Sequence, residues 1–162
     1  MTRIKKYLHI NALLIAITLL QACSFGSKGM VDPEKKFNAS SKQAVVLISS
    51  HVDTGLLEIN EIPLKPHLYP THDVFAFYVS TGKKFTLKNI TLAMGEESPR
   101  LLPLNHTKSL KIVEPGIYFY GNIMKVGDKL YLDYLQKKGT LKLARHRYPE
   151  VFKKLNPINF DY

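Results

Sequence analysis

From residue 43 onward, turn-forming residues divide the chain into short apolar runs. The runs are rich in β-branched and aromatic residues, and glycine, proline, asparagine or aspartate separates them. Runs of this length and composition are typical of β-strands, because helices need longer stretches with a different period. Seven segments fit this description: 43–49, 56–63, 74–80, 85–94, 109–113, 117–124 and 129–135.

Three turns are expected to join neighbouring strands as hairpins. Thr81-Gly82-Lys83 should fold the third strand against the fourth, and Gly127-Asp128 should fold the sixth against the seventh. Glu114-Pro115-Gly116 should join the fifth and sixth strands through a type II turn, in which the glycine takes a positive φ. Segment 95–107 carries two prolines and is expected to be a loop.

The end of the chain has a helical period. Apolar residues recur at positions 141, 144, 148, 151, 152 and 155, which predicts an amphipathic helix over 141–155. Pro149 is expected to start a fresh helical turn, and Pro157 to end the helix. The expected fold class is therefore mainly β: a small antiparallel β-sandwich or open barrel of about seven strands with a C-terminal amphipathic helix.

The N-terminus has the features of an export signal. Arg3, Lys5 and Lys6 give it a basic start, and residues 10–20 are almost wholly apolar. As a helix, this run would cover about half of a hydrocarbon core of about 30 Å, so it is too short to span a membrane. The length is typical of the apolar centre of a signal peptide.

The apolar run ends in Leu20-Gln21-Ala22-Cys23, which resembles the lipobox of bacterial lipoproteins. In that family the cysteine receives a diacylglyceryl group, the signal is cut before it, and the new amine is acylated. The resemblance implies that Cys23 is the lipidation site and the first residue of the mature protein. In Gram-negative members of that family, an aspartate directly after the cysteine marks retention in the inner membrane. This chain has Ser24 at that position, so the resemblance implies an outer-membrane anchor, with the domain facing the periplasm. The alternative is an ordinary signal peptide with an incidental cysteine.

Composition then suggests three regions. Residues 1–22 are expected to be the signal peptide, residues 23–42 the lipidated cysteine with a flexible tether, and residues 43–162 the β-sandwich domain. The tether is predicted because segment 24–42 is rich in Gly, Ser, Lys and Asn and has no apolar period. Cys23 is the only cysteine, so the chain forms no internal disulfide and must be stabilised by its core.

The expected mature protein is basic. Three of the 23 basic residues lie in the signal peptide, so 20 remain against 13 acidic residues, a net charge of +7. The lysines are spread along the chain, with short pairs at Lys83-Lys84 and Lys137-Lys138, which favours a solvated surface over a binding motif. An anionic envelope polymer stays open as a partner, and nucleic acid is not expected outside the cytoplasm.

Two further segments resemble parts of small β-sandwich lipoproteins of unassigned function. Val113–Gly121 is similar to their Pro-Gly turn and aromatic strand, and Tyr148–Phe152 is similar to their closing helix. This resemblance implies a fold and no particular chemistry.

Histidines are the first candidates for chemistry. His51, Asp53, His67, His72 and Asp73 fall within 23 positions, and imidazole and carboxylate are natural zinc ligands. The spacing of His67 and His72 around a proline fits neither a helix nor a strand. We therefore interpret them as ordinary loop histidines and assign no metal.

Other catalytic patterns are not found in the sequence. The serines lack a nucleophile elbow, and the carboxylate pairs Glu96-Glu97 and Glu58 with Glu61 have no apolar pocket beside them in the sequence pattern. No catalytic residue and no cofactor is assigned.

Aromatic residues on neighbouring strands offer a possible binding face. Tyr118, Tyr120, Tyr131 and Tyr134 could stack on a sugar or a peptide, but cross-strand core pairs are the interpretation we favour.

The expected function is that of a membrane-anchored lipoprotein of the bacterial cell envelope, acting as a non-catalytic binding or structural accessory. Its expected partners are membrane lipid, through the acylated Cys23, and an envelope protein or anionic envelope polymer. The alternative is a hydrolase or metal-dependent enzyme that uses the loop histidines.

Overall fold

The computed structural model describes most of the chain after the predicted signal peptide. The described residues are 29–38, 40–52, 56–64, 73–94, 97–104, 107–127, 129–135, 137–158 and 160, with only the backbone described at 57, 94 and 97–103. Cys23 lies outside them. None of the helices in these ranges is long and apolar enough to cross a membrane.

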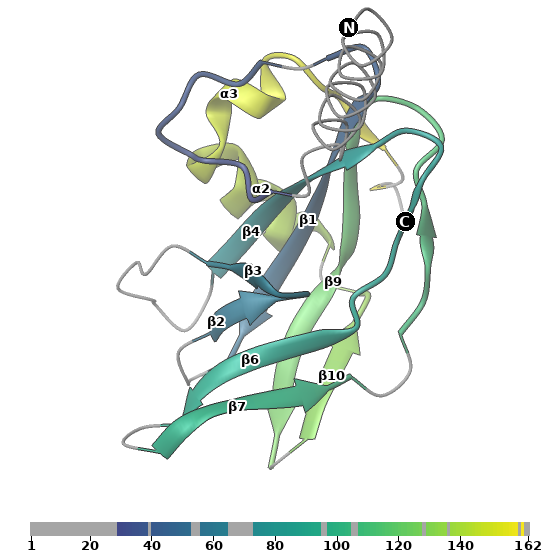
Figure 1. Cartoon of the computed structure of the whole chain (residues 1–162). Helices are drawn as coiled ribbons and strands as arrows, with labels where there is room; N and C mark the ends of the chain where they lie inside the picture. Colours follow the sequence, from purple (N-terminus) through teal and green to yellow (C-terminus); the bar gives the residue numbers. More distant parts are fainter. Residues whose placement is uncertain are drawn as a thin grey trace, which may run out of the picture.

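The largest sheet is the central layer of the molecule (Figure 1). Its strand order is β10-β9-β1-β4, and β11 pairs with the beginning of β9. The bounds are β1 Gln43–His51, β4 Asp73–Ser80, β9 Ile117–Val126, β10 Lys129–Asp133 and β11 Pro157–Ile158.

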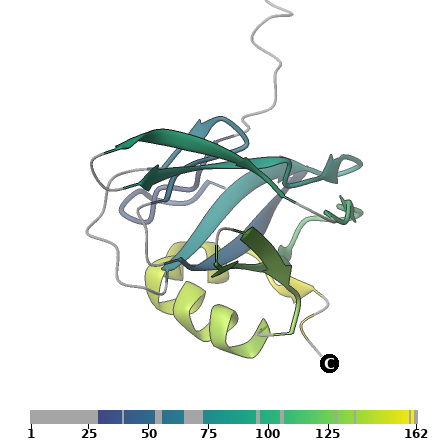
Figure 2. The same cartoon turned by 90° about the horizontal axis from the view of Figure 1, so that it is seen from below.

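Two smaller sheets and two helices complete the fold. The second sheet has the order β3-β2-β6-β7, and a two-stranded ribbon joins β5 to β8. Figure 2 shows the helices on one face of the central sheet and β6 and β7 on the other. The bounds are β2 Leu56–Ile59, β3 Ile62–Pro63, β5 Lys84–Phe85, β6 Asn89–Met94, β7 Glu97–Pro103, β8 Leu110–Lys111, α2 Lys137–Arg147 and α3 Pro149–Phe152.

The central sheet is buried on both faces. Seven consecutive residues of β1, 44–50, are buried. Val46 and Ile48 belong to the core shared with the second sheet, and Val45 and Leu47 belong to the core under the helices. A strand that is covered on both sides has no face toward solvent, which explains the unbroken apolar run 44–48.

The expected mainly β class with a C-terminal helix is confirmed, and the sheets do not close into a barrel. The expected antiparallel arrangement is wrong at the centre, where β1 and β9 run parallel, with Val45 opposite Ile117. Parallel neighbours need a long crossover, and here the chain makes it through the second sheet and the β5–β8 ribbon. The described residues form eleven strands, several of only two residues, where about seven were expected.

Two of the three expected hairpins are also wrong. Gly82 does turn the chain, with φ of 79°, but the next strand, β5, pairs with β8 and not with β4. β8 therefore does not pair with β9 either. The pairing lets Phe85 and Leu110 pack against the core below the ribbon. The β9–β10 hairpin is confirmed, and Gly127 has φ of 59°.

The segment expected to be a loop, 95–107, contains β7. β7 pairs antiparallel with β6 and forms the edge of the second sheet. An edge strand tolerates the missing N–H of proline, so Pro99 and Pro103 do not prevent pairing.

Gly116 is needed for space and not for a positive φ, so the expected type II turn is wrong. A Cβ on Gly116 would lie 2.8 Å from Cγ1 of Ile158, and closer still to its Cδ1. Glycine thus allows β11 to approach the start of β9.

The predicted single helix is two helices. α2 begins at Lys137, four residues before the expected start at position 141, and α3 begins at Pro149. Tyr148 between them has φ of −122° and ψ of 54°, because proline disfavours the helical conformation in the residue before it.

The predicted flexible tether is wrong for residues 29–37, which belong to the fold. Val31 and Phe37 are 2% and 3% exposed, and the ring of Phe37 stacks on Tyr78 with centroids 5.7 Å apart. Met30 pairs antiparallel with Phe77, so this segment covers the free edge of β4. The apolar side chains at positions 30, 31 and 37 are the sequence signal for this packing.

We expect Gly116→Ala to lower the free energy of unfolding by about 1–3 kcal/mol, because the new methyl group overlaps Ile158. The matched control is Gly139→Ala, since no atom lies within 4 Å of a Cβ at this position of α2. The control should raise stability by about 0.5–1 kcal/mol. Urea unfolding measures both, and equal effects would contradict the close approach of β11.

Candidate functional site

The β5–β8 ribbon carries a pair of opposed lysines. Lys84 lies directly opposite Lys111, and Phe85 lies opposite Leu110. Because side chains alternate along a strand, Phe85 enters the core while both lysines are exposed. Like charges directly opposite each other destabilise a ladder. The core residues of the ribbon, not its charged pair, therefore stabilise this pairing.

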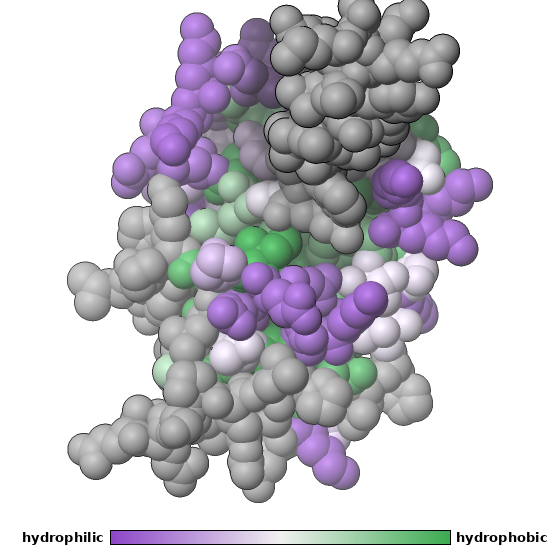
Figure 3. Space-filling model, in the orientation of Figure 1, coloured by the Kyte–Doolittle hydropathy of each residue, from purple (hydrophilic) through white to green (hydrophobic). Residues whose placement is uncertain are grey.

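Backbone hydrogen bonds bring two more lysines to the same end of the molecule. The Ile112 N–H donates to the Lys83 carbonyl at 3.0 Å, and the Thr81 N–H donates to the Lys42 carbonyl at 2.9 Å. We call the exposed set Lys42, Lys83, Lys84 and Lys111 the lysine end. Figure 3 shows several hydrophilic groups on this face of the molecule, and one of them lies at the right side, where Figure 1 draws the ribbon.

Acidic residues are scarce around the lysine end. Segments 74–94 and 107–113, which contain most of it, have no aspartate or glutamate, and Glu114 follows in the next turn. Val113, in the same turn region, is 61% exposed. The lysine end is thus a basic surface beside an exposed apolar side chain, suited to an anionic ligand. The sequence interpretation of scattered lysines missed it, although the acid-free segments are a signal for it.

A buried hydroxyl network lies between α2 and the central sheet. Thr140 Oγ1 donates to Asn122 Oδ1 at 3.0 Å and lies 3.0 Å from Ser49 Oγ. Since the single hydroxyl proton of Thr140 goes to Asn122, the Ser49 hydroxyl donates to Thr140. Asn122 Nδ2 in turn donates to Asp133 Oδ2 at 3.5 Å. The Ser49 proton therefore goes to a hydroxyl and not to a base, and the network holds the helix to the sheet.

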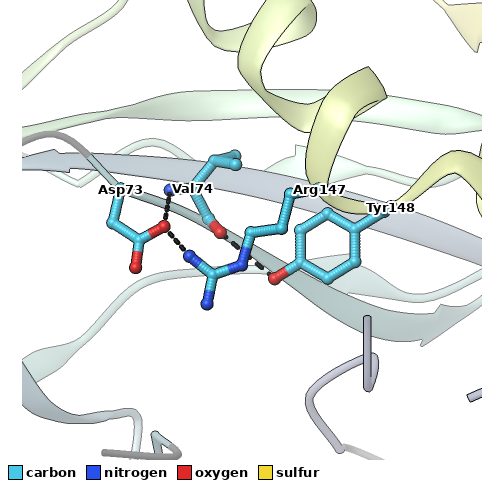
Figure 4. Close-up of polar contacts among 4 residues, drawn as sticks. All are labelled: Asp73, Val74, Arg147 and Tyr148. Carbon is cyan, nitrogen blue, oxygen red and sulfur yellow. Dashed lines mark hydrogen bonds and ion pairs between the residues drawn. The ribbon is translucent and has the colours of Figure 1, made fainter. Parts of the chain in front are cut away.

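A partly buried ion pair holds the other end of α2 (Figure 4). Asp73 pairs with Arg147, and Asp73 Oδ1 also accepts a hydrogen bond of 2.7 Å from the Val74 N–H. The Tyr148 hydroxyl donates to the Val74 carbonyl at 3.1 Å. Burial raises the pKa of Tyr148, and the charge of Arg147 opposes part of this shift.

The candidate metal residues are only partly within the described chain. His51 ends β1, and Asp73 begins β4 beside it, opposite Ser50. Asp53, His67 and His72 lie outside the described residues. Within the ranges that the structure describes, no three His, Cys, Asp or Glu residues gather as metal ligands would.

The four tyrosines divide between the core and the surface. Tyr118 and Tyr120 are 2% and 3% exposed, which confirms the core interpretation for both. Tyr131 is 44% exposed, and the Lys108 ammonium lies 4.9 Å from the ring centroid of Tyr134. The structure therefore does not gather all four rings on one binding face.

The two carboxylate pairs are only partly within the described chain. Glu58 accepts a hydrogen bond of 3.0 Å from the Thr91 hydroxyl, and Glu61 is exposed at a φ of 64°. Glu96 lies outside the described residues, and of Glu97 only the backbone is described.

Comparison with known proteins gives no relative: no family model, no curated protein and no solved structure matches the chain.

Thr140→Val should lower the free energy of unfolding by about 1–3 kcal/mol, because it removes the hydroxyl that bonds the Ser49 hydroxyl and the Asn122 Oδ1 inside the protein. Thr140→Ser keeps the hydroxyl and should recover much of this loss. Thr86→Val removes the exposed hydrogen bond to Ser109 and should change stability by less than about 0.5 kcal/mol. Urea unfolding of the three variants gives the comparison, and equal losses at positions 86 and 140 would rule out the buried network.

The raised pKa of Tyr148 predicts a loss of stability in alkali. Its folded-state pKa lies above tyrosine's ordinary pKa of 10.0, so the unfolded chain releases this proton first and stability falls as pH rises through and above that value. Burial also raises the pKa of Tyr78 and Tyr120, so Tyr148→Phe should reduce the alkaline slope without abolishing it. The measurement is the free energy of unfolding against pH, and an unchanged slope would contradict the assignment.

Proposed function

We propose that the protein is a membrane-anchored lipoprotein of the bacterial cell envelope, and that it acts as a non-catalytic binding or structural accessory. The observation that carries this proposal is Leu20-Gln21-Ala22-Cys23 behind a basic start and a short apolar run. The acylated Cys23 is the anchor, and Ser24 favours the outer membrane, with the domain in the periplasm.

The packing of residues 29–37 supports action close to the membrane. Only residues 24–28 separate the proposed anchor from the folded part at Gly29. The six residue steps from Cys23 to Gly29 span at most about 22 Å when fully extended. A domain held at this distance is suited to partners at the membrane surface.

The distribution of polar groups supports a binding role. The buried hydroxyl network and the Asp73–Arg147 pair both fasten α2 to the central sheet. The lysine end is exposed, so its charge is available to a partner. An envelope protein with an acidic surface or an anionic envelope component fits this charge.

The alternative of a hydrolase or metal-dependent enzyme depends on His67 and His72, which lie outside the described residues. Asp73, a described member of the same group, is engaged by Arg147.

Labelling with radioactive palmitate in a bacterial host tests the anchor. The natural chain should incorporate label and lose its first 22 residues, whereas Cys23→Ser should accumulate as unlabelled precursor. Ser24→Asp is the matched control: it should stay labelled and shift from the outer to the inner membrane fraction. Normal labelling of Cys23→Ser would refute the proposal.

A further inference from the structure

We propose that the lysine end faces the membrane and binds the headgroups of anionic phospholipids, so that the anchored domain has a fixed orientation. This inference rests on the proposed lipid anchor, and it adds the surface of the domain that contacts the bilayer and the class of lipid that it binds.

The chain enters the fold along the edge of β4. The Tyr78 N–H donates to the Gly29 carbonyl at 3.0 Å, and the Val31 N–H donates to the Ala76 carbonyl at 2.7 Å. The segment therefore runs antiparallel to β4, as the pairing of Met30 with Phe77 also shows. Its N-terminal residue, Gly29, is the one nearer the Ser80 end of β4.

The lysine end lies at this same end of β4. Ser80 is opposite Gln43, next to Lys42, and the turn after Ser80 leads directly to Lys83 and Lys84. From Tyr78 to Ser80 the strand advances only about 7 Å. The point where the chain joins the fold is therefore close to the basic surface, and an anchor six residues upstream, at Cys23, brings that surface to the bilayer.

The lysine end carries positive charge that its own segments do not neutralise. Lys84 and Lys111 oppose each other across the ribbon, and segments 74–94 and 107–113 supply no carboxylate to neutralise them. An anionic headgroup between them would relieve this repulsion. Each lysine close to an anionic bilayer increases binding by about fivefold. Four lysines together are enough to select one orientation of a domain that is already tethered.

An exposed apolar side chain accompanies the lysines. Val113 is 61% exposed in the turn after Lys111. Apolar side chains among basic ones are typical of protein surfaces that lie in the headgroup region. We choose phospholipid over a soluble anionic polymer because the short connection holds the lysine end next to the lipid itself.

The opposite end of the molecule offers a matched reference. β9 runs from Ile117, beside the lysine end, to Val126, a distance of about 30 Å for a strand of this length. Val126 is also 61% exposed, the same as Val113. Because acylation blocks the only natural thiol, Val113→Cys and Val126→Cys each provide a single site for a fluorophore.

The experiment uses the full lipidated protein in vesicles whose headgroups carry an energy acceptor. With phosphatidylglycerol in the bilayer, a donor at position 113 should transfer more energy than a donor at position 126. High salt, or vesicles of phosphatidylcholine alone, should reduce the difference to the part that the short connection produces, because both remove the attraction of the lysines. Equal transfer from the two positions in phosphatidylglycerol vesicles would overturn the proposal.

Two quadruple variants with equal loss of charge complete the test. Replacing Lys42, Lys83, Lys84 and Lys111 by Gln should reduce the difference between the two positions to its value in phosphatidylcholine. Replacing Lys125, Lys129, Lys138 and Lys142 by Gln should preserve it, and similar loss in both variants would overturn the proposal. If the protein does not carry acyl chains at all, the proposed anchor fails. If it is acylated but the two positions transfer equally, only the orientation fails.

Discussion

The burial of β1 on both faces is the constraint on which the rest of the structure depends. A strand without a polar face needs an apolar layer on each side, and the chain supplies the second sheet on one side and the two helices on the other. β9 runs parallel to β1 in the same sheet, so the chain between them must cross over. That crossover contains the second sheet, which covers one of the two faces. The buried contacts at both ends of α2 follow from the same need, because they keep the helical layer in place.

The polar groups inside the molecule are used for this docking. Thr140 of α2 joins Ser49 and Asn122 of the sheet, and Arg147 joins Asp73. A buried charge or hydroxyl is costly unless it is paired, so these partners specify how the helix sits on the sheet. Polar chemistry open to a partner is then found on the surface, where the lysine end is the most uniform group of charges that we describe.

The edge of β4 links the fold to the proposed anchor. An exposed strand edge is a site of unwanted pairing, and residues 29–31 cover it with backbone hydrogen bonds. The same contacts determine where the chain enters the domain and at which end. Residues 29–37, which have the composition of a tether, thus have a structural role, and the chain enters the domain at the same end as the lysine end.

The sequence by itself determined most of the extended segments, because alternation and turn residues are local properties. It placed Tyr118 and Tyr120 on the core face of one strand and the turn at Gly127 between two strands, as the structure has them. Partner choice is not local: the β1–β9 and β5–β8 pairs depend on which apolar faces must be covered together. The prolines in 95–107 predicted a loop, because a strand tolerates proline only at the edge of a sheet. The edge position of β7 exists only in the assembled sheet, so the sequence could not reveal it. The lysine end was likewise decided by the tertiary structure, since it joins Lys42, Lys83, Lys84 and Lys111 from distant segments through strand pairing.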